Sequence, residues 1–170
     1  MPQKFRDRIP VGGMPAGLMT WYAPGQKAVA LVTYWMAMVA GEPPRLRAAW
    51  PGRRDPRSLF WPGGDFVLNV PGDHDLQLLL RLVGSGQVCF DVEQDLAMPI
   101  APASVVSAPR LAQWPVQLEC RGGRVDTQPA EPEVAGEVAL LHCNGNVVDV
   151  GTQLDFAKLM PFGVPNHGRL

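Results

Sequence analysis

The sequence predicts a small, mainly β protein folded as an antiparallel barrel or sandwich. Glycine and proline occur 18 times each among 170 residues, which favours many turns over long helices. Several short segments also have the branched, aromatic or alternating composition of strands. The length fits one domain and no shift in composition divides the chain, so we expect a single domain over residues 1–170.

The first predicted strands form a hairpin. Residues Pro15–Trp21 and Lys27–Trp35 are mostly small, branched or aromatic, and Tyr22-Ala-Pro-Gly-Gln26 between them has the composition of a turn. Residues Arg45–Trp50 lie between two proline-containing breaks and are predicted as a third strand.

Two short helices are expected on either side of a fourth strand. Asp55, followed by a proline, is typical of a helix start and predicts a helix over 56–61. Residues Asp65–Val70 form the predicted strand. The second helix covers roughly Asp73–Val83, with Asp73 as its cap and leucines at three- and four-residue spacing, and Gly84 ends it.

The remaining segments extend the β pattern. Four prolines exclude a regular helix from Ala97–Pro109 and leave an extended loop or a short edge strand around Ser104–Ser107. Residues Val134–Cys143 predict another strand, and Asn144-Gly145 after it is a strong signal for a hairpin into 146–150.

Alternation in Val116–Arg121 predicts a strand with one buried and one solvent-facing side. We expect Val116, Leu118 and Cys120 to face the core. The polar residues between them, Gln117, Glu119 and Arg121, are then expected to face water.

The overall charge and hydropathy argue against binding to nucleic acid or to a membrane. A net charge of -1 and a pI of about 6.3 give no field that attracts nucleic acid or an anionic membrane. The longest apolar stretch, Ala28–Ala40, is shorter than the ~20 residues of a membrane span. The first ten residues do not resemble a secretory signal, so we expect a cytoplasmic protein.

No familiar catalytic or metal motif appears in the sequence. The 3 cysteines and 3 histidines lack ligand spacing, so we expect no metal site and interpret the cysteines as buried free thiols. Gly84-Ser85-Gly86 matches neither a dinucleotide fingerprint nor the GxSxG nucleophile motif.

Two groups of residues are candidates for ligand contacts. Arg53, Arg54 and Arg57 surround a predicted helix start, where guanidinium groups and backbone N–H groups together suit an anion; a solvated surface patch is the alternative. Tyr34 and Trp35 either line a site for a ring-shaped ligand or pack into the core.

Short motifs in a fixed order add a family resemblance. The following motifs carry it: Thr20, the turn Gly25–Ala28, Thr33-Tyr34, Glu42-Pro-Pro44, Arg54-Asp-Pro56, Gly64–Pro71, Ser107-Ala-Pro-Arg-Leu111, Leu118-Glu-Cys120 and Gly136-Glu-Val138. Over roughly residues 12–150 the chain resembles the flavin reductase-like family of FMN-binding split barrels, which includes flavoredoxin.

The resemblance implies a six-stranded antiparallel Greek-key split barrel with short flanking helices. It further implies a homodimer with FMN, or alternatively FAD, near the subunit interface and NAD(P)H or a redox partner as electron donor. The flavin would carry hydride or electrons to flavin or a small acceptor, so no catalytic side chain is required.

The resemblance also assigns residues to the flavin. The ring and ribityl wall would consist of Thr20, Thr33, Tyr34, Trp35 and Met36. Arg54 would bind the phosphate with help from Arg53 and Ser58, and Ser85 would make a second contact.

Two departures from the family pattern support a rival hypothesis. Ala28 stands where the family has an asparagine able to hydrogen-bond flavin, and Pro56 stands where it has a threonine. The alternative is therefore a flavin-free dimeric split-barrel protein with a binding or structural role.

Overall fold

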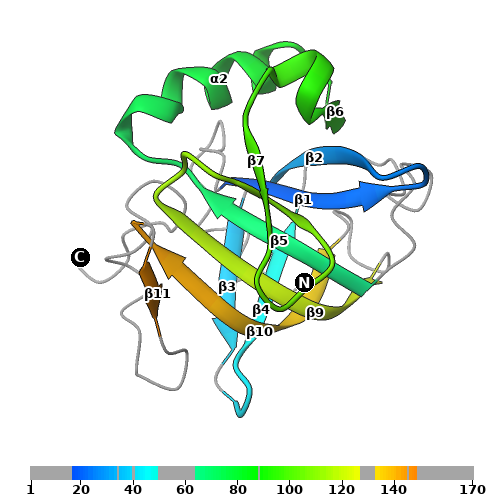
Figure 1. The fold of residues 1–170 in the computed structure, drawn as a ribbon, viewed down its shortest axis with the longest axis vertical. Helices are drawn as coiled ribbons and strands as arrows, with labels where there is room; N and C mark the ends of the chain where they lie inside the picture. The colour runs from blue at the N-terminus through cyan, green and yellow to red at the C-terminus, as the bar shows by residue number, and fades with distance from the viewer. Residues whose placement is uncertain are drawn as a thin grey trace, which may run out of the picture.

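The computed structural model describes residues 17–33, 35–39, 41–49, 64–87, 89–126, 133–144 and 146–148. These residues form a mainly β protein whose paired strands are all antiparallel, which confirms the predicted fold class (Figure 1). The predicted helix over 56–61 lies outside the described residues.

The first predicted hairpin is present. Strands β1 (Gly17–Ala23) and β2 (Lys27–Thr33) pair along their whole length, from Gly17 opposite Thr33 to Ala23 opposite Lys27. The turn between them places Gly25 at φ 82° and Gln26 at φ 61°. Glycine adopts such angles freely, whereas glutamine does so at a cost in backbone strain.

Of the seven other strands of the main sheet, Trp35–Val39 and Cys89–Asp91 were not predicted as strands, and the other five overlap predicted segments. The seven strands complete the main sheet. They are β3 (Trp35–Val39), β4 (Arg45–Ala49), β5 (Gly64–Val70), β6 (Cys89–Asp91), β9 (Val116–Asp126), β10 (Glu133–Cys143) and β11 (Asn146–Val148). Their order is β3-β4-β10-β9-β5-β1-β2-β6, with β11 paired to β10. This sheet has nine strands among the described residues, where the family resemblance implies a six-stranded barrel.

The order of the strands closes the sheet into a barrel. Strands β2 and β3 are separated in the chain by residue 34 alone, yet β2 lies near one end of the strand order and β3 at the other. The sheet must therefore curl until its two ends meet at this short connection. Figure 1 shows the resulting curvature.

One apolar cluster fills the barrel. Its large members include Met19, Trp21, Leu31, Phe66 and Leu118, each at most 1 % exposed. The three residues predicted to face the core from β9 belong to this cluster, which confirms that part of the alternation pattern.

A second apolar cluster joins the predicted helix to the outside of the hairpin. The helix begins as a 3₁₀ turn (Asp73–Asp75) and continues as α2 (Leu76–Gly84), whose Leu79 and Leu82 pack with Leu18, Ala30 and Val32. The N-cap position of this turn is Gly72 rather than the predicted Asp73, and Asp75 Oδ2 accepts from Gly72 N at 2.9 Å.

The proline-rich segment forms an arm on the barrel. After a π-helical turn (Val92–Leu96), strands β7 (Ile100–Pro102) and β8 (Pro109–Leu111) pair with each other and cross the outer face of β1 and β5 (Figure 1). Residues 104–107 are a loop rather than an edge strand. The regular ladder ends at the pair Pro102 and Pro109, and one backbone hydrogen bond beyond it, from Ala103 N to Ala108 O, closes the base of the loop.

The arm corrects one prediction made from alternation. Gln117 and Glu119 were expected to face water, but they are 2 % and 0 % exposed. They face the arm, which covers this side of β9, and only Arg121 is exposed as expected. The pattern of the strand gave the correct side for each residue but could not indicate a second layer.

Two further observations complete the fold. Among the described residues, no helix is long and apolar enough to cross a membrane. All three cysteines are free; Cys120 is buried, as predicted, whereas Cys89 and Cys143 are only partly buried.

Candidate functional site

Two cavities that share Lys27 and Asp91 open beside the β1–β2 turn. The first, of about 610 Å³, has walls of mixed polar and apolar character: Gly25, Gln26, Lys27, Ala28, Asp91, Glu93, Gln94, Met98 and Ile100. The second, of about 470 Å³, is more apolar: Ala23, Pro24, Lys27, Val29, Cys89, Phe90, Asp91 and Asp95.

An ion pair separates the two cavities. Lys27 Nζ lies 2.7 Å from Asp91 Oδ2, and Asp91 Oδ1 accepts from the backbone N–H groups of Glu93 and Gln94 at 3.0 and 2.9 Å. The hydrogen bond and the charge of Asp91 raise the pKa of Lys27. The hydrogen bond from Lys27, together with the backbone donors, lowers the pKa of Asp91. Both groups are therefore charged at neutral pH.

The charge balance of these cavities does not fit a flavin phosphate. Asp91, Glu93 and Asp95 present three carboxylates against the single ammonium of Lys27, which is itself paired. Ala28, where the family pattern has an asparagine, offers no hydrogen-bonding side chain. An anionic group would be repelled here, so these cavities do not suit a phosphate.

Cys89 does not make the second cavity a nucleophilic site. Burial raises the pKa of its thiol to about 11. The thiolate, which is the reactive form, is therefore a very small fraction at neutral pH.

The corner between β2 and β3 brings together three of the residues assigned to the flavin ring. Thr33 is the last residue of β2, and Trp35 and Met36 begin β3 opposite Ala49 and Ala48. Thr33 is fully buried, and its Oγ1 donates to Gly17 O at 3.1 Å. That hydroxyl fixes the end of the hairpin, and Tyr34 lies outside the described residues.

Thr20 does not join this corner. It shares a face of the hairpin with Leu18, which packs under α2, whereas Thr33 shares the opposite face with Leu31 inside the barrel. Thr20 Oγ1 donates to Pro109 O at 2.6 Å and accepts from Asn69 Nδ2 at 2.9 Å. Its hydroxyl thus binds the arm to the barrel.

Ser85 lies at the C-terminal end of α2, which stops at Gly84 as predicted. Its Oγ donates to Leu82 O at 2.6 Å and accepts from Gln87 N at 3.2 Å, and its backbone N–H donates to Arg81 O at 3.0 Å. The C-terminal end of a helix carries partial negative charge. Ser85 is therefore poorly placed to bind a phosphate.

Three residues assigned to the phosphate, Arg53, Arg54 and Ser58, lie outside the described residues. Among the residues that the structure does describe, no group of three or more His, Cys, Asp or Glu side chains could hold a metal ion.

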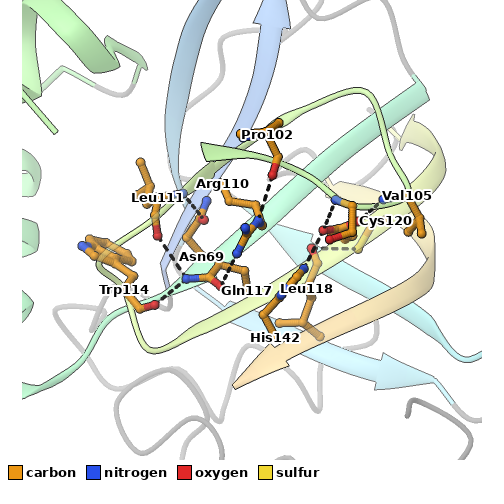
Figure 2. A network of polar contacts seen from close by, with 12 residues as sticks. Asn69, Pro102, Val105, Arg110, Leu111, Trp114, Gln117, Leu118, Cys120 and His142 are labelled. Atoms are coloured by element: carbon orange, nitrogen blue, oxygen red, sulfur yellow. Dashed lines mark hydrogen bonds and ion pairs between the residues drawn. The ribbon is translucent and has the colours of Figure 1, made fainter. Parts of the chain in front are cut away.

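A layer of buried polar side chains on the outside of the barrel escaped the sequence analysis (Figure 2). Asn69, Gln117 and His142 lie opposite one another on β5, β9 and β10, and Glu119 is on the same face of β9. Gln117 Nε2 donates to Leu111 O at 3.0 Å, and Asn69 Oδ1 accepts from Leu111 N at 2.9 Å. A polar residue at every second position of a strand was the available signal, but it equally indicates a solvent-facing side.

Comparison with known proteins finds relatives by structure but none by sequence. No known family model matches this sequence, and no curated protein sequence does. Solved structures do match it throughout the fold. The 2-nitrobenzoate 2-nitroreductase of Pseudomonas fluorescens is 19 % identical with a TM-score of 0.65, and the match covers 92 % of this chain and 76 % of that one.

Two other solved structures give similar values. Flavoredoxin from Methanosarcina acetivorans is 21 % identical with a TM-score of 0.63, covering 89 % of this chain and 80 % of that one. The NADH:FAD oxidoreductase of Streptomyces globisporus is 15 % identical with a TM-score of 0.56, covering 88 % and 94 %. The chain therefore has the split-barrel fold of flavin reductase-like and FMN-binding proteins, as its sequence motifs imply.

Proposed function

We propose that this chain is an FMN-binding flavoprotein of the flavin reductase-like type. It would transfer hydride or electrons from a reduced nicotinamide or a redox partner to flavin or a small acceptor. The observation that carries the proposal is the agreement between the ordered motifs and the split-barrel fold, which extends over 92 % of the chain in one comparison. Fold alone does not define an activity, so the site must be tested directly.

The corner of β2 and β3 is the proposed wall of the flavin ring. The bound flavin would supply the hydride or electron chemistry, and the protein would orient the ring and exclude water. Tyr34, Trp35 and Met36 are the proposed wall residues. The buried hydrogen bond from Thr33 to Gly17 fixes the end of β2 and so sets where β3 begins.

We assign the phosphate to Arg54, with Arg53 and Ser58 as further contacts. The acidic character of the cavity beside the β1–β2 turn supports this assignment, because carboxylates there would repel the phosphate. A guanidinium group binds a phosphate in a forked, charge-assisted contact. Ser85 and Thr20 contribute less, since their hydroxyls are used within the chain.

The proposal includes a homodimer in the cytoplasm, with the flavin near the subunit interface. FMN is the proposed cofactor, with FAD as the alternative, and NAD(P)H is the proposed electron donor. One structural neighbour is described as an NADH:FAD oxidoreductase, which supports FAD as the alternative cofactor and a reduced nicotinamide as the electron donor.

A flavin-free dimeric binding or structural protein is the second candidate. It is favoured by the internal use of the Thr20 and Thr33 hydroxyls and by the alanine at position 28. Under this alternative, the barrel would have kept its scaffold and lost the groups that hold flavin.

Titration of the purified protein with flavin separates the two candidates. FMN, FAD and riboflavin are added separately, and quenching of flavin fluorescence is recorded. The proposal expects saturable binding with FMN tighter than riboflavin, followed by NAD(P)H oxidation once flavin is present. Absence of saturable binding by all three flavins would favour the flavin-free alternative.

A further inference from the structure

The loop Ala103–Ala108 joins the two strands of the arm and lies on the outside of the barrel. Among the described residues its apolar cluster is small, with Val67, Val106 and Ala108 buried and Ala103 and Ala139 packed against them. One backbone hydrogen bond, from Ala103 N to Ala108 O at 3.2 Å, closes its base. Its attachment to the barrel must therefore depend on other contacts.

Charged side chains of the barrel provide these contacts through the backbone of the loop. Glu119 Oε1 accepts from Ser104 N at 2.7 Å, and Glu119 Oε2 accepts from Val105 N at 2.8 Å. Two further contacts flank this pair. Asp65 Oδ2 accepts from Ser107 N at 2.8 Å, and Arg121 Nη2 donates to Val105 O at 3.0 Å.

Glu119 differs from Asp65 and Arg121 because its side chain is completely buried. It is 0 % exposed, and its Oε1 also lies 2.6 Å from Nε2 of His142, which is 4 % exposed. Oε1 of Glu119 thus has two partners, Ser104 N and His142 Nε2, and Oε2 has one, Val105 N. Protonation would remove the negative charge that strengthens the hydrogen bonds from Ser104 N and Val105 N, so the hold of Glu119 on the loop would weaken.

We propose that Glu119 and His142 form a latch that holds the loop Ala103–Ala108 against the barrel, and that protonation of Glu119 releases the loop. His142 acts as a positioning residue, because its contact with Oε1 orients the carboxylate toward the two loop amides. The inference concerns the outer face of the barrel and does not depend on flavin binding.

The direction of the pH response follows from the environment of Glu119. Burial alone would raise its pKa, but the hydrogen bonds from Ser104 N and Val105 N, with the hydrogen bond and charge of His142, lower the pKa below the ordinary value. A lowered pKa in the folded state means that the latch is complete above the ordinary glutamate pKa. The latch is then lost as the pH falls through the lowered value.

Other charged groups that face the loop must be separated from Glu119. They come from β5 (Asp65), β8 (Arg110, whose Nε donates to Pro102 O at 3.2 Å), β9 (Arg121) and β10 (His142). The arginines do not titrate in the relevant range. Asp65 is the carboxylate that could imitate the response, and its contact is with Ser107 rather than with Ser104 and Val105.

NMR of the full chain tests the latch. The amide shifts and hydrogen-exchange protection factors of Ser104 and Val105 are followed from pH 7 downward, with Leu118 of β9 as a marker of the intact barrel. We expect both loop amides to titrate together with a midpoint below the ordinary glutamate pKa. Their protection should fall at least about tenfold while that of Leu118 is unchanged.

Variants identify the titrating group. Glu119→Gln should remove the pH step of both amides and lower their protection already at pH 7, because its NH₂ group cannot accept a hydrogen bond. Asp65→Asn is the matched control and should leave the step in place. If Glu119→Gln does not fold, the wild-type titration and Asp65→Asn decide.

Three results would overturn the latch. The first is a step that persists in Glu119→Gln, and the second is a step that disappears in Asp65→Asn. The third is loss of loop protection only together with loss of protection at Leu118, since that would mean unfolding of the barrel rather than release of the loop.

Discussion

Asn69 and Gln117 lie opposite each other on β5 and β9, and each binds one backbone group of Leu111 in the arm. Asn69 also donates through Nδ2 to Leu18 O and to Thr20 Oγ1, both at 2.9 Å. A single buried amide therefore connects strands β1, β5 and β8.

Replacing this amide should destabilise the whole protein. Asn69→Leu leaves Leu111 N and Leu18 O buried without their side-chain partner, and each buried group left unsatisfied costs about 1–3 kcal/mol. We expect a loss of about 2–4 kcal/mol in the free energy of unfolding, measured with urea. Gln77→Leu, at an exposed position of α2, is the control and should change stability by less than about 0.5 kcal/mol. Equal effects of the two changes would contradict this role for Asn69.

Gly136 is required by close packing inside the barrel. A Cβ atom there would lie 2.6 Å from Phe66 Cε1 and 3.2 Å from Arg121 O. Gly136→Ala should therefore cost about 1–3 kcal/mol of stability, because the ring and the backbone must both shift. Gly84→Ala, at the end of α2, meets nothing within 4 Å and should be neutral or slightly stabilising in the same thermal or urea unfolding experiment.

The ion pair of Arg47 with Glu133 joins β4 to β10. Arg47 Nη2 lies 2.5 Å from Glu133 Oε2, and the glutamate side chain is only 3 % exposed while that of Arg47 is 36 % exposed. Arg47→Ala leaves a buried carboxylate without its partner. We expect the free energy of unfolding to fall by roughly 1–3 kcal/mol, which lies between the values for exposed and for buried ion pairs. Arg45→Ala, an exposed arginine of the same strand, should cost clearly less in parallel urea melts.

Arg54 is expected to supply much of the affinity for the flavin phosphate. Hydrogen bonds to charged groups contribute ~1.5–3 kcal/mol, so Arg54→Ala should weaken FMN binding by roughly 10- to 150-fold. Riboflavin, which lacks the phosphate, should bind the variant as it binds the original protein. Equal losses for both ligands would indicate a disturbed fold, and no loss for either would return these arginines to a solvated surface patch.

A dimer is expected in solution. The proposal derives from the resemblance to a family whose members are expected to work as homodimers. Analytical ultracentrifugation should give a mass near twice the 18.5 kDa of one chain. A mass near 18.5 kDa at every concentration would exclude the dimer.

Local signals explain which parts of the fold could be predicted. The β1–β2 hairpin, β5, α2 and the β10–β11 hairpin each have their own turn or cap residues and their own periodicity within a few positions. The barrel-facing residues of β9 follow from the same rule. These features require no knowledge of distant contacts.

The polar layer could not be predicted because its meaning depends on a distant segment. Alternation places Gln117 and Glu119 on one side of β9, but whether that side meets water is decided by the arm. The same limit applies to Thr20 and Thr33. Their sequence positions suited a ligand, whereas their hydroxyls are used by Pro109 and Gly17.

The short connection between β2 and β3 also constrains the order of folding. The β1–β2 hairpin can form early, since its partners are neighbours in the chain. Strand β3 reaches its place only when β4 meets β10, and the Arg47–Glu133 contact between those two strands spans 86 residues. Closing so long a loop is entropically costly. Closure of the barrel should therefore be a late and slow step of folding. The β1–β2 hairpin should form before it.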